Sequence, residues 1–241
     1  MIRIANDGDM RGCIGSEAAI RIVSAYEAYG TDTRFLKIYA DDKDTRMSLM
    51  DGVAVLHAPL GINEEWLSFL SMHPDIKTVR TDACSGAVLA QHWRLPMKSG
   101  DFMSCLGAVN ASTVQTGVAR YEALYAFLSD YFVLPPFDSW YVDVSHRVRH
   151  GRCHIASVIE GERVICNAMS VAETTRDALL GAVATHPDWR RRGLAGKCIN
   201  HLINELSDKR IHISPIDDEA KRLYEKLGFV VVGSWAELSR V

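Results

Sequence analysis

The first third of the chain switches between helical and strand-like spacing of its hydrophobic residues. A helical pattern runs to Tyr29, with Ser16 as its N-cap and Gly30 as its stop. Asn63 opens a second helical pattern that continues to about residue 72. Strand patterns are found at residues 35–39, 46–50, 52–57 and 76–80. This alternation favours an α/β fold with a mixed sheet.

The middle of the chain carries weaker signals. Residues 99–117 are rich in Ser, Gly, Thr and Asn, which predicts a linker or an exposed strand-and-turn segment. A helix is expected over residues 121–132, ended by Pro135 and Pro136. From Trp140 onward we expect mainly strands, at residues 153–159, 163–171, 178–185, 211–214 and 229–233.

One stretch organises the second half. The apolar run 178–184 is typical of a strand buried on both faces, and it breaks at Pro187. Three arginines and Gly193 then open an amphipathic helix. Its first turn offers unpaired backbone N–H groups and the positive end of the helix dipole, and Gly193 and Gly196 leave room for a close approach. The stretch therefore predicts a phosphate site.

These residues resemble a known family. Arg190-x-x-Gly193-x-Ala195 is similar to the acyl-coenzyme A signature of the GNAT N-acetyltransferases, Gln/Arg-x-x-Gly-x-Gly/Ala. Residues 220–229, which include Tyr224, resemble the helix of that family that carries a tyrosine and precedes the last core strand. The resemblance covers residues 120–241 and implies the mixed-sheet GNAT fold in the C-terminal half.

A short internal echo bears on the N-terminal half. Residues 53–59 are similar to residues 182–187, and each segment is followed by a glycine and a helix. The first copy lacks the signature, and the carboxylates of Glu64 and Glu65 would repel a pyrophosphate at that helix end. We expect residues 1–115 to form a degenerate GNAT-like or other α/β domain, and residues 116–241 the GNAT domain.

The resemblance also implies which residues bind coenzyme A. Val183 and Thr185 correspond to positions that bind the pantetheine arm, and backbone N–H groups after Arg190 to those that bind the pyrophosphate. A main-chain N–H near Val183 would polarise the thioester carbonyl. The implied cofactor-binding residues are Val183, Ala184, Thr185, Arg190, Arg191, Arg192, Gly193, Leu194, Ala195, Gly196, Lys197 and Asp217. Asp217 replaces an asparagine common in the family, so it can accept a hydrogen bond but not donate one.

Tyr224 occupies the family's general-acid position. The ordinary pKa values of a phenol and a thiol differ by about 1.5 units, so proton transfer to the leaving thiolate would cost about 2 kcal/mol. The alternative is a core aromatic, because Ala220, Leu223 and Leu227 share its helix face. The general base stays open among four residues: Asp177, Glu173, Asp143 and His154.

Composition adds limits rather than a function. The net charge of −3 gives no overall reason to expect nucleic acid. The six cysteines form no Cys-x-x-Cys pair, which favours reduced thiols in a cytoplasmic protein, and no signal peptide or membrane span is expected. His146, His150 and His154 would align on one helix, but strands are expected there, so no metal is predicted. Nearby Arg147, Arg149 and Arg152 could line an acidic substrate's path or be solvated strand ends.

Together these features predict an N-acetyltransferase that transfers an acetyl group from acetyl-coenzyme A to a primary amine by direct attack. The acceptor would be a small molecule or a peptide, without nucleic acid or membrane, and a homodimer is allowed. The alternative is a non-catalytic acyl-coenzyme A binding or sensing module. Nucleic-acid binding through the arginine run is disfavoured by the net charge and by the lack of interleaved aromatic residues.

Overall fold

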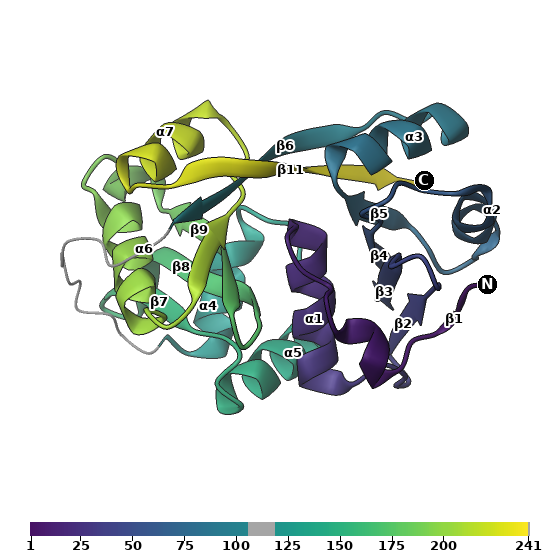
Figure 1. Cartoon of the computed structure of the whole chain (residues 1–241). Coiled ribbons are helices and arrows are strands. Elements are labelled where there is room, and N and C mark those ends of the chain that lie inside the picture. Colours follow the sequence, from purple (N-terminus) through teal and green to yellow (C-terminus); the bar gives the residue numbers. More distant parts are fainter. Residues whose placement is uncertain (106–118, 241) are drawn as a thin grey trace. The chain divides into compact units, whose positions relative to one another are not determined.

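The chain folds into two compact units (Figure 1). The computed structural model describes residues 1–105 and 119–240. Unit 1 comprises Met1–Phe102 and Val231–Val241, and unit 2 comprises Met103–Val230. The domain boundary expected between residues 115 and 116 lies outside the described residues. The last eleven residues, which the sequence grouped with the second domain, belong to unit 1.

Unit 1 is a mixed sheet with helices on both faces. Its strands lie in the order β1-β2-β3-β4-β5-β11, and the β4–β5 pair is parallel while the other described pairs are antiparallel. Helix α1 packs on one face, and α2 and α3 help to cover the other. The strands are β1 Arg3–Ile4, β2 Leu36–Ala40, β3 Arg46–Met50, β4 Val53–His57, β5 Thr78–Thr81 and β11 Val230–Ser239. The helices are η1 Asp7–Met10, α1 Glu17–Tyr29, α2 Glu64–Met72 and α3 Ala83–Trp93.

Unit 2 has the same layered construction. Its strands lie in the order β6-β10-β9-β8-β7, with only the β9–β10 pair parallel. Helices α6 and α7 pack on one face, and α4 and α5 on the other. The strands are β6 Lys98–Cys105, β7 Ile155–Glu160, β8 Arg163–Glu173, β9 Asp177–Thr185 and β10 Arg210–Ile213. The helices are α4 Tyr121–Ser129, α5 Phe137–Arg149, η2 Pro187–Trp189, α6 Leu194–Glu205 and α7 Asp218–Lys226.

The two halves of the chain repeat one order of elements. The order β2-β3-β4-α2-β5-α3-β6 recurs as β7-β8-β9-α6-β10-α7-β11. The strands that carry the sequence echo, β4 and β9, occupy equivalent places, and each pairs in parallel with the strand after the following helix. The duplication that the sequence echo predicts is therefore confirmed at the level of the fold.

The final strand of each copy is exchanged. Residues 103–105 of β6 pair with β10, and residues 236–239 of β11 pair with β5. Each unit is thus completed by the last strand of the other copy. Strand exchange depends on contacts that are remote in sequence, and no local pattern predicts it.

Short capping signals predicted the first helices well. Ser16 accepts a hydrogen bond from the amide of Ala19 at the start of α1, and Asn63 does the same for Trp66 at the start of α2. Each side chain accepts a hydrogen bond from a first-turn amide that has no partner within the helix, and this bond fixes where the helix begins.

The expectation of strands from Trp140 onward is wrong at its start, where α5 runs from Phe137 to Arg149. Trp140, Val144 and Arg147 are buried at a helical spacing. The β-branched and aromatic residues of this segment favour a strand locally, and packing of one helix face against α4 and β8 overrides that preference.

The segment after residue 81 also differs from expectation. The sequence predicted neither α3, which Asp82 caps, nor a buried strand in residues 99–117. Residues 98–105 form β6, and its last four residues are buried rather than exposed. Gly86 weakens the helical pattern of α3, but a Cβ there would lie 2.4 Å from the Ala236 side chain, so the close approach of β11 requires the glycine.

Candidate active site

Two parallel strands separate at the centre of unit 2. Strands β9 and β10 pair from Asp177/Arg210 to Leu180/Ile213. β10 ends at Ile213, whereas β9 continues through residues 181–185. The final part of β9 therefore extends past its parallel partner, and this opens one wall of a cavity.

Helix α6 begins directly beyond that strand end. Gly193 is its N-cap residue and has a φ of 74°, and no side chain of the described residues makes a capping hydrogen bond there. Arg191 also has a positive φ, of 60°. Backbone in alternating conformations of this kind turns successive amides toward one side, where they can bind an anion. A Cβ built at Gly193 would have no described heavy atom within 4 Å, so the approach to these amides is open.

A cavity of about 610 Å³ lies between these elements. Its walls come from the end of β9, the start of α6, the α4–α5 connection and one face of α7. All its lining residues belong to unit 2. This is large enough for much of a drug-sized or cofactor-sized ligand.

Most of the predicted cofactor-binding residues line this cavity. They are Val183, Ala184, Thr185, Arg190, Arg191, Gly193, Leu194, Ala195, Gly196 and Asp217. Arg192 and Lys197 do not line it: the Arg192 guanidinium stacks 4.4 Å from the centre of the Trp189 ring, and Lys197 is exposed on α6. Trp189 itself does line the cavity.

Tyr224 lines the same cavity, on α7. Its side chain is only 5% exposed and packs beside Phe229, with ring centroids 6.1 Å apart. It is therefore part of the core and of the cavity wall at once. Burial, with a smaller contribution from the charge of Asp217, raises the pKa of Tyr224 to about 12. The phenol consequently holds its proton throughout the physiological pH range.

Asp217 is the N-cap of α7. Its Oδ1 accepts a hydrogen bond from the Ala220 amide at 2.8 Å. This is the role that the sequence allows for an aspartate, and it fixes the start of the helix that carries Tyr224.

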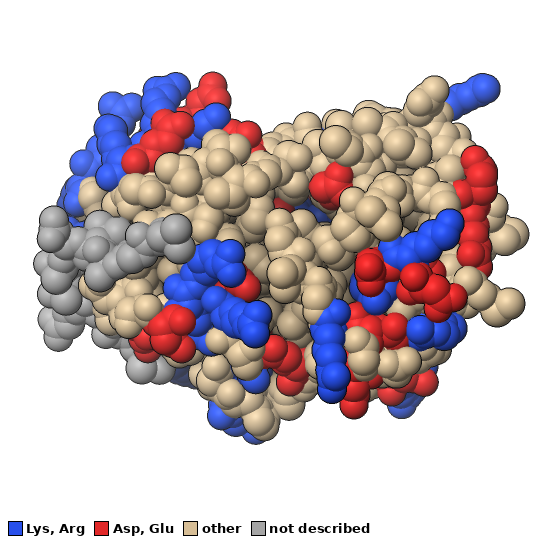
Figure 2. Space-filling view, in the orientation of Figure 1, with Lys and Arg blue, Asp and Glu red and all other residues tan. Residues whose placement is uncertain are grey.

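The charge of the cavity wall is positive on balance. Four cationic side chains line it, Arg190, Arg191, Arg222 and Lys226, against the two carboxylates of Asp217 and Glu219. Figure 2 shows Lys and Arg side chains gathered over α7 at the upper left, with a few acidic ones among them. Such a wall attracts a polyanionic ligand.

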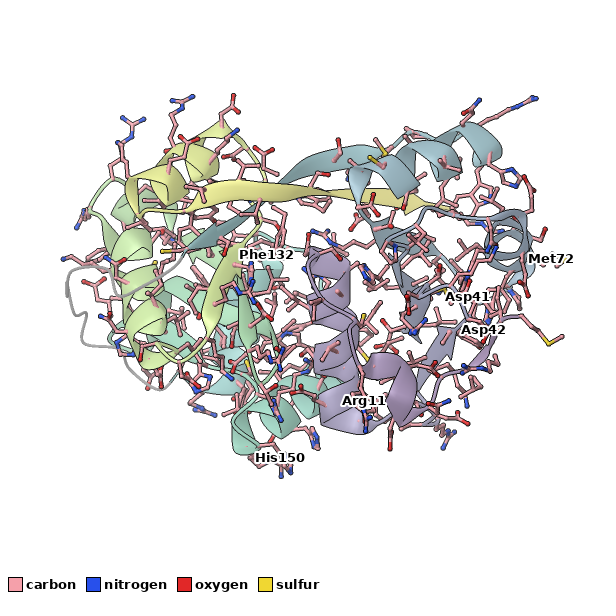
Figure 3. All side chains as sticks on the ribbon, viewed as in Figure 1. Arg11, Asp41, Asp42, Met72, Phe132 and His150 are labelled. Carbon is pink, nitrogen blue, oxygen red and sulfur yellow. The ribbon has the colours of Figure 1, made fainter. Side chains whose placement is uncertain are left out.

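Sequence reasoning missed part of the lining. Arg222 and Lys226 of α7 also line the cavity. They lie two residues before and two residues after Tyr224, so helical spacing from Tyr224 did not point to them. Tyr131 and Phe132 come from the α4–α5 connection and carry no motif, so no sequence signal pointed to them; Figure 3 labels Phe132. They add aromatic surface to a wall that also contains Trp189, Ile216 and Leu223.

None of the four candidate bases lines the cavity. Asp177 accepts a hydrogen bond from His212 Nε2 at 2.8 Å, and burial that would raise its pKa is outweighed by this bond and by nearby positive charge, so its pKa is lowered. Asp143 lies on α5, not on a strand as expected, and pairs with Arg147 at 2.8 Å. The cavity-lining residues of the described chain thus offer no candidate base from the predicted set.

The other two candidates bond to each other. His154 Nδ1 lies 2.7 Å from Glu173 Oε1, and Ser170 Oγ also donates to that carboxylate. Glu173 is fully buried. The hydrogen bond to Glu173 raises the pKa of His154. This pair joins the residue before β7 to the last residue of β8.

The histidine cluster is also arranged differently from the expectation. His146 lies on α5 and His150 is its C-cap, so two of the three do align on a helix, with ring centroids 4.2 Å apart. Figure 3 shows His150 at the end of that helix. His154 is held by Glu173 instead. Arg147 is buried on α5 and is not a solvated strand end. Among the described residues no group of three metal-ligating side chains is found.

The equivalent helix of unit 1 is built differently. Asn63 caps α2, and Glu64 and Glu65 occupy its first turn. Glu65 Oε1 also accepts a hydrogen bond from the Ile2 amide at 2.9 Å. The amides that α6 leaves open are therefore partly occupied in α2, and the carboxylates beside them oppose an anion.

Comparison with known proteins decides the family of unit 2. A family model described as an acetyltransferase (GNAT) domain matches residues 149–231. These residues are a GNAT acetyltransferase domain. The family uses acyl-coenzyme A. No curated protein is similar enough in sequence to match the chain.

Solved structures of GNAT proteins resemble nearly the whole chain. A GCN5-related N-acetyltransferase from Kribbella flavida is 14% identical, with a TM-score of 0.61 over 94% of this chain and 96% of that one. A putative GNAT-family acetyltransferase from Novosphingobium aromaticivorans is 17% identical, with a TM-score of 0.60 over 94% and 100%. A tandem GNAT protein from the clavulanic acid biosynthesis pathway is 13% identical, with a TM-score of 0.57 over 100% and 98%. At these identities the likeness shows the fold, which is the GNAT fold in tandem.

The described residues contain no helix that is both long enough and apolar enough to span a membrane.

Proposed function

We propose that the chain is an N-acetyltransferase that uses acetyl-coenzyme A to acetylate a primary amine. The observation that carries the proposal is the cavity in the GNAT domain, where open amides at the start of α6 and the buried phenol of Tyr224 line one space. A binding module without catalysis would need the amides but not a protonated phenol at the cavity wall.

The residues present fit coenzyme A. The uncapped α6 terminus with Gly193 at its entrance suits a pyrophosphate, and Arg190 and Arg191 add positive charge. Val183 and Thr185, beyond the end of β10, suit the pantetheine arm because main-chain groups of a strand edge can pair with it. When bound, acetyl-coenzyme A supplies an acyl group activated as a thioester.

Tyr224 would supply a proton to the departing thiolate. With a pKa of about 12, the phenol is a weaker acid than its ordinary pKa suggests. Transfer to a thiolate of ordinary pKa 8.5 would then cost about 5 kcal/mol rather than about 2 kcal/mol. The same burial disfavours a thiolate, so a hydrogen bond from Tyr224 that strengthens as charge develops is the more effective contribution.

The proposal is tested by binding and by turnover, measured separately. Calorimetric titration with acetyl-coenzyme A should give a dissociation constant in roughly the micromolar range. Thiol release should then be measured with a panel of amines that includes amino acids, a polyamine, aminoglycosides and peptides with a free N-terminus. We expect release above the rate without amine for one class.

Two variants calibrate the binding measurement. Arg191→Ala removes a cation from the cavity wall and should weaken binding, whereas Lys197→Ala changes an exposed residue outside the cavity and should not. Binding without thiol release for any amine would favour the acyl-coenzyme A binding or sensing module. No binding at all would overturn both functions.

A further inference from the structure

Strand β9 carries a bulge where it reaches the cavity. Two of its residues, Ala182 and Val183, stand opposite a single residue of β8, Ala168. The residue pairs on either side are Asn167 with Ala184 and Met169 with Gly181. An extra residue of this kind bends the strand and re-aims the side chains that follow it.

The bulge exchanges the two faces of β9. Before it, Ala178 and Leu180 pack in the core beneath α6. After it, Ala182 and Ala184 pack in the opposite core with α4 and α5, and Val183 packs on the α6 side. Without the extra residue, Val183 would lie on the other face, because the side-chain period of a strand is two. The bulge therefore places Val183 on the α6 side of β9, next to the start of that helix.

The bulge requires an unfavourable backbone conformation at Ala182. Its φ is 49°, in the left-handed region that a residue with a Cβ seldom adopts, because the Cβ comes too close to the following carbonyl oxygen. A bulge also takes a residue out of the regular ladder, so its carbonyl needs another donor when buried. That donor is the side chain of Asn167, whose Nδ2 lies 3.0 Å from the Ala182 oxygen.

Asn167 is itself held in one orientation. Ser157 Oγ on β7 donates to Asn167 Oδ1 at 2.8 Å, so the amide nitrogen points toward β9. Both Ser157 and Asn167 are 0% exposed. Burial of a polar pair costs free energy unless its hydrogen bonds are made, whereas an apolar pair could fill the same space without this desolvation cost. The hydrogen bond from Asn167 to the Ala182 carbonyl explains why a polar pair occupies this buried position.

We propose that Asn167 is a positioning residue for acyl transfer, which holds the β9 bulge so that the main chain at Val183 meets the thioester carbonyl. The inference rests on the proposed function, since the thioester would lie along this wall. Asn167 contacts the bulge and does not line the cavity, so it would act through the Ala182–Val183 backbone. Ser157 supports it by fixing the direction of its amide.

The test uses Asn167→Asp, which keeps the size of the side chain and its acceptor for Ser157. An ionised carboxylate cannot donate to the Ala182 carbonyl and repels it. With acetyl-coenzyme A labelled at the acyl carbonyl, difference infrared spectra of the wild type should show a carbonyl band at lower frequency than in solution. In the variant near pH 8 we expect this shift to be lost while acetyl-coenzyme A still binds. The turnover number should fall by roughly 10–100-fold with KM for acetyl-coenzyme A unchanged.

At lower pH the aspartate of Asn167→Asp regains a hydrogen-bond donor. A buried aspartate becomes protonated more readily than an exposed one, and its O–H can then donate to Ala182. The infrared shift of Asn167→Asp should therefore return as the pH falls, whereas that of the wild type should not change. A residue that only fills the core would give no such pH dependence.

Two further variants keep the inference falsifiable if Asn167→Asp does not fold. Ser157→Ala leaves Asn167 in place but lets its amide turn, and should lose part of the infrared shift. Adding Ala182→Gly, which removes the Cβ penalty at the positive φ, should restore part of that loss. An unchanged shift in both Asn167→Asp and Ser157→Ala would overturn the inference.

The free protein separates this inference from the proposed function. The amide resonance of Val183 in a ¹H–¹⁵N spectrum should move in Asn167→Asp and in Ser157→Ala without any ligand. If the wild type fails to bind acetyl-coenzyme A, the proposed function is wrong whatever this resonance does. If it binds and the Val183 resonance stays in place in both variants, only the role of Asn167 is wrong.

Discussion

Two glycines at the start of α6, Gly193 and Gly196, have different structural roles although the sequence predicts the same role for both. Gly193 and Gly196 both belong to the predicted signature, and both were expected to let a phosphate approach the backbone. Gly193 has a φ of 74°, which favours glycine. A Cβ at Gly196 would instead meet the side chains of Leu223 and Leu227 on α7, at 3.7 and 3.8 Å, which is ordinary contact. Only the first position requires a glycine for its backbone conformation.

Alanine substitutions should therefore separate the two positions. Gly193→Ala should cost roughly 1–2 kcal/mol in the conformation that opens α6, which weakens acetyl-coenzyme A binding by about 5- to 30-fold. Gly196→Ala should leave binding unchanged and raise the free energy of unfolding by about 0.4–1 kcal/mol. Calorimetric titration and denaturant unfolding measure the two effects. Equal loss of binding in both variants would contradict the distinction.

Tyr224 offers a second test at this scale. Tyr224→Phe keeps the buried ring beside Phe229, so the fold and acetyl-coenzyme A affinity should be retained. Without the phenolic proton, turnover should fall by roughly 100-fold or more. Because the pKa of Tyr224 is about 12, the wild-type rate should show no loss from phenol ionisation up to about pH 10. A variant rate equal to that of the wild type would leave Tyr224 as a core aromatic only.

At the scale of elements, the sequence predicted those helix starts that local capping interactions determine. Caps at Ser16 and Asn63 gave the starts of α1 and α2, and the arginine–glycine signature gave the start of α6. Helix α5 was missed because its residue types favour strands, and only packing reveals its helical period. The bulge in β9 was not predictable, since an alanine at a positive φ leaves no mark in the sequence.

The pairing of β7 with β8 contains an ionisable contact that predicts a pH dependence. The hydrogen bond that His154 donates to Glu173 raises the pKa of His154, so protonation of this histidine stabilises the folded state. This contribution is fully present below the unfolded pKa of about 6.5 and is lost as the pH rises through the higher folded pKa. His154→Gln should therefore lower Tm more near pH 6 than near pH 9.

The matched control for that prediction is His92→Gln, on the exposed side of α3. It should lower Tm little at either pH. Thermal unfolding followed by circular dichroism measures both variants. A Tm difference for His154→Gln that does not change with pH would show that its contact with Glu173 carries no proton linkage.

At the scale of the whole molecule, the exchanged strands mean that the two halves of the sequence do not coincide with the two units of the structure. A fragment of residues 116–241 would contain the GNAT signature and Tyr224 but would lack β6, the antiparallel partner of β10. Its β11 would lack β5. Both losses expose unpaired strand edges, which promote association.

We expect this fragment to aggregate or to elute as a broad multimer in size-exclusion chromatography, whereas the full chain should elute as a single species. Coexpression with residues 1–115 should restore a discrete complex, because that fragment supplies both β5 and β6. A monodisperse, cooperatively unfolding fragment 116–241 would show that the exchanged strands are dispensable for unit 2.

The same exchange imposes an order on biosynthesis. The ribosome releases β1 to β5 first, yet β11, which pairs with β5, follows all the other described strands in the sequence. The β5 edge of unit 1 therefore stays uncovered until β11 has been translated, even though proteins commonly acquire structure from the N-terminus onward. β6 is translated before the other strands of unit 2, so unit 2 can complete its sheet earlier than unit 1.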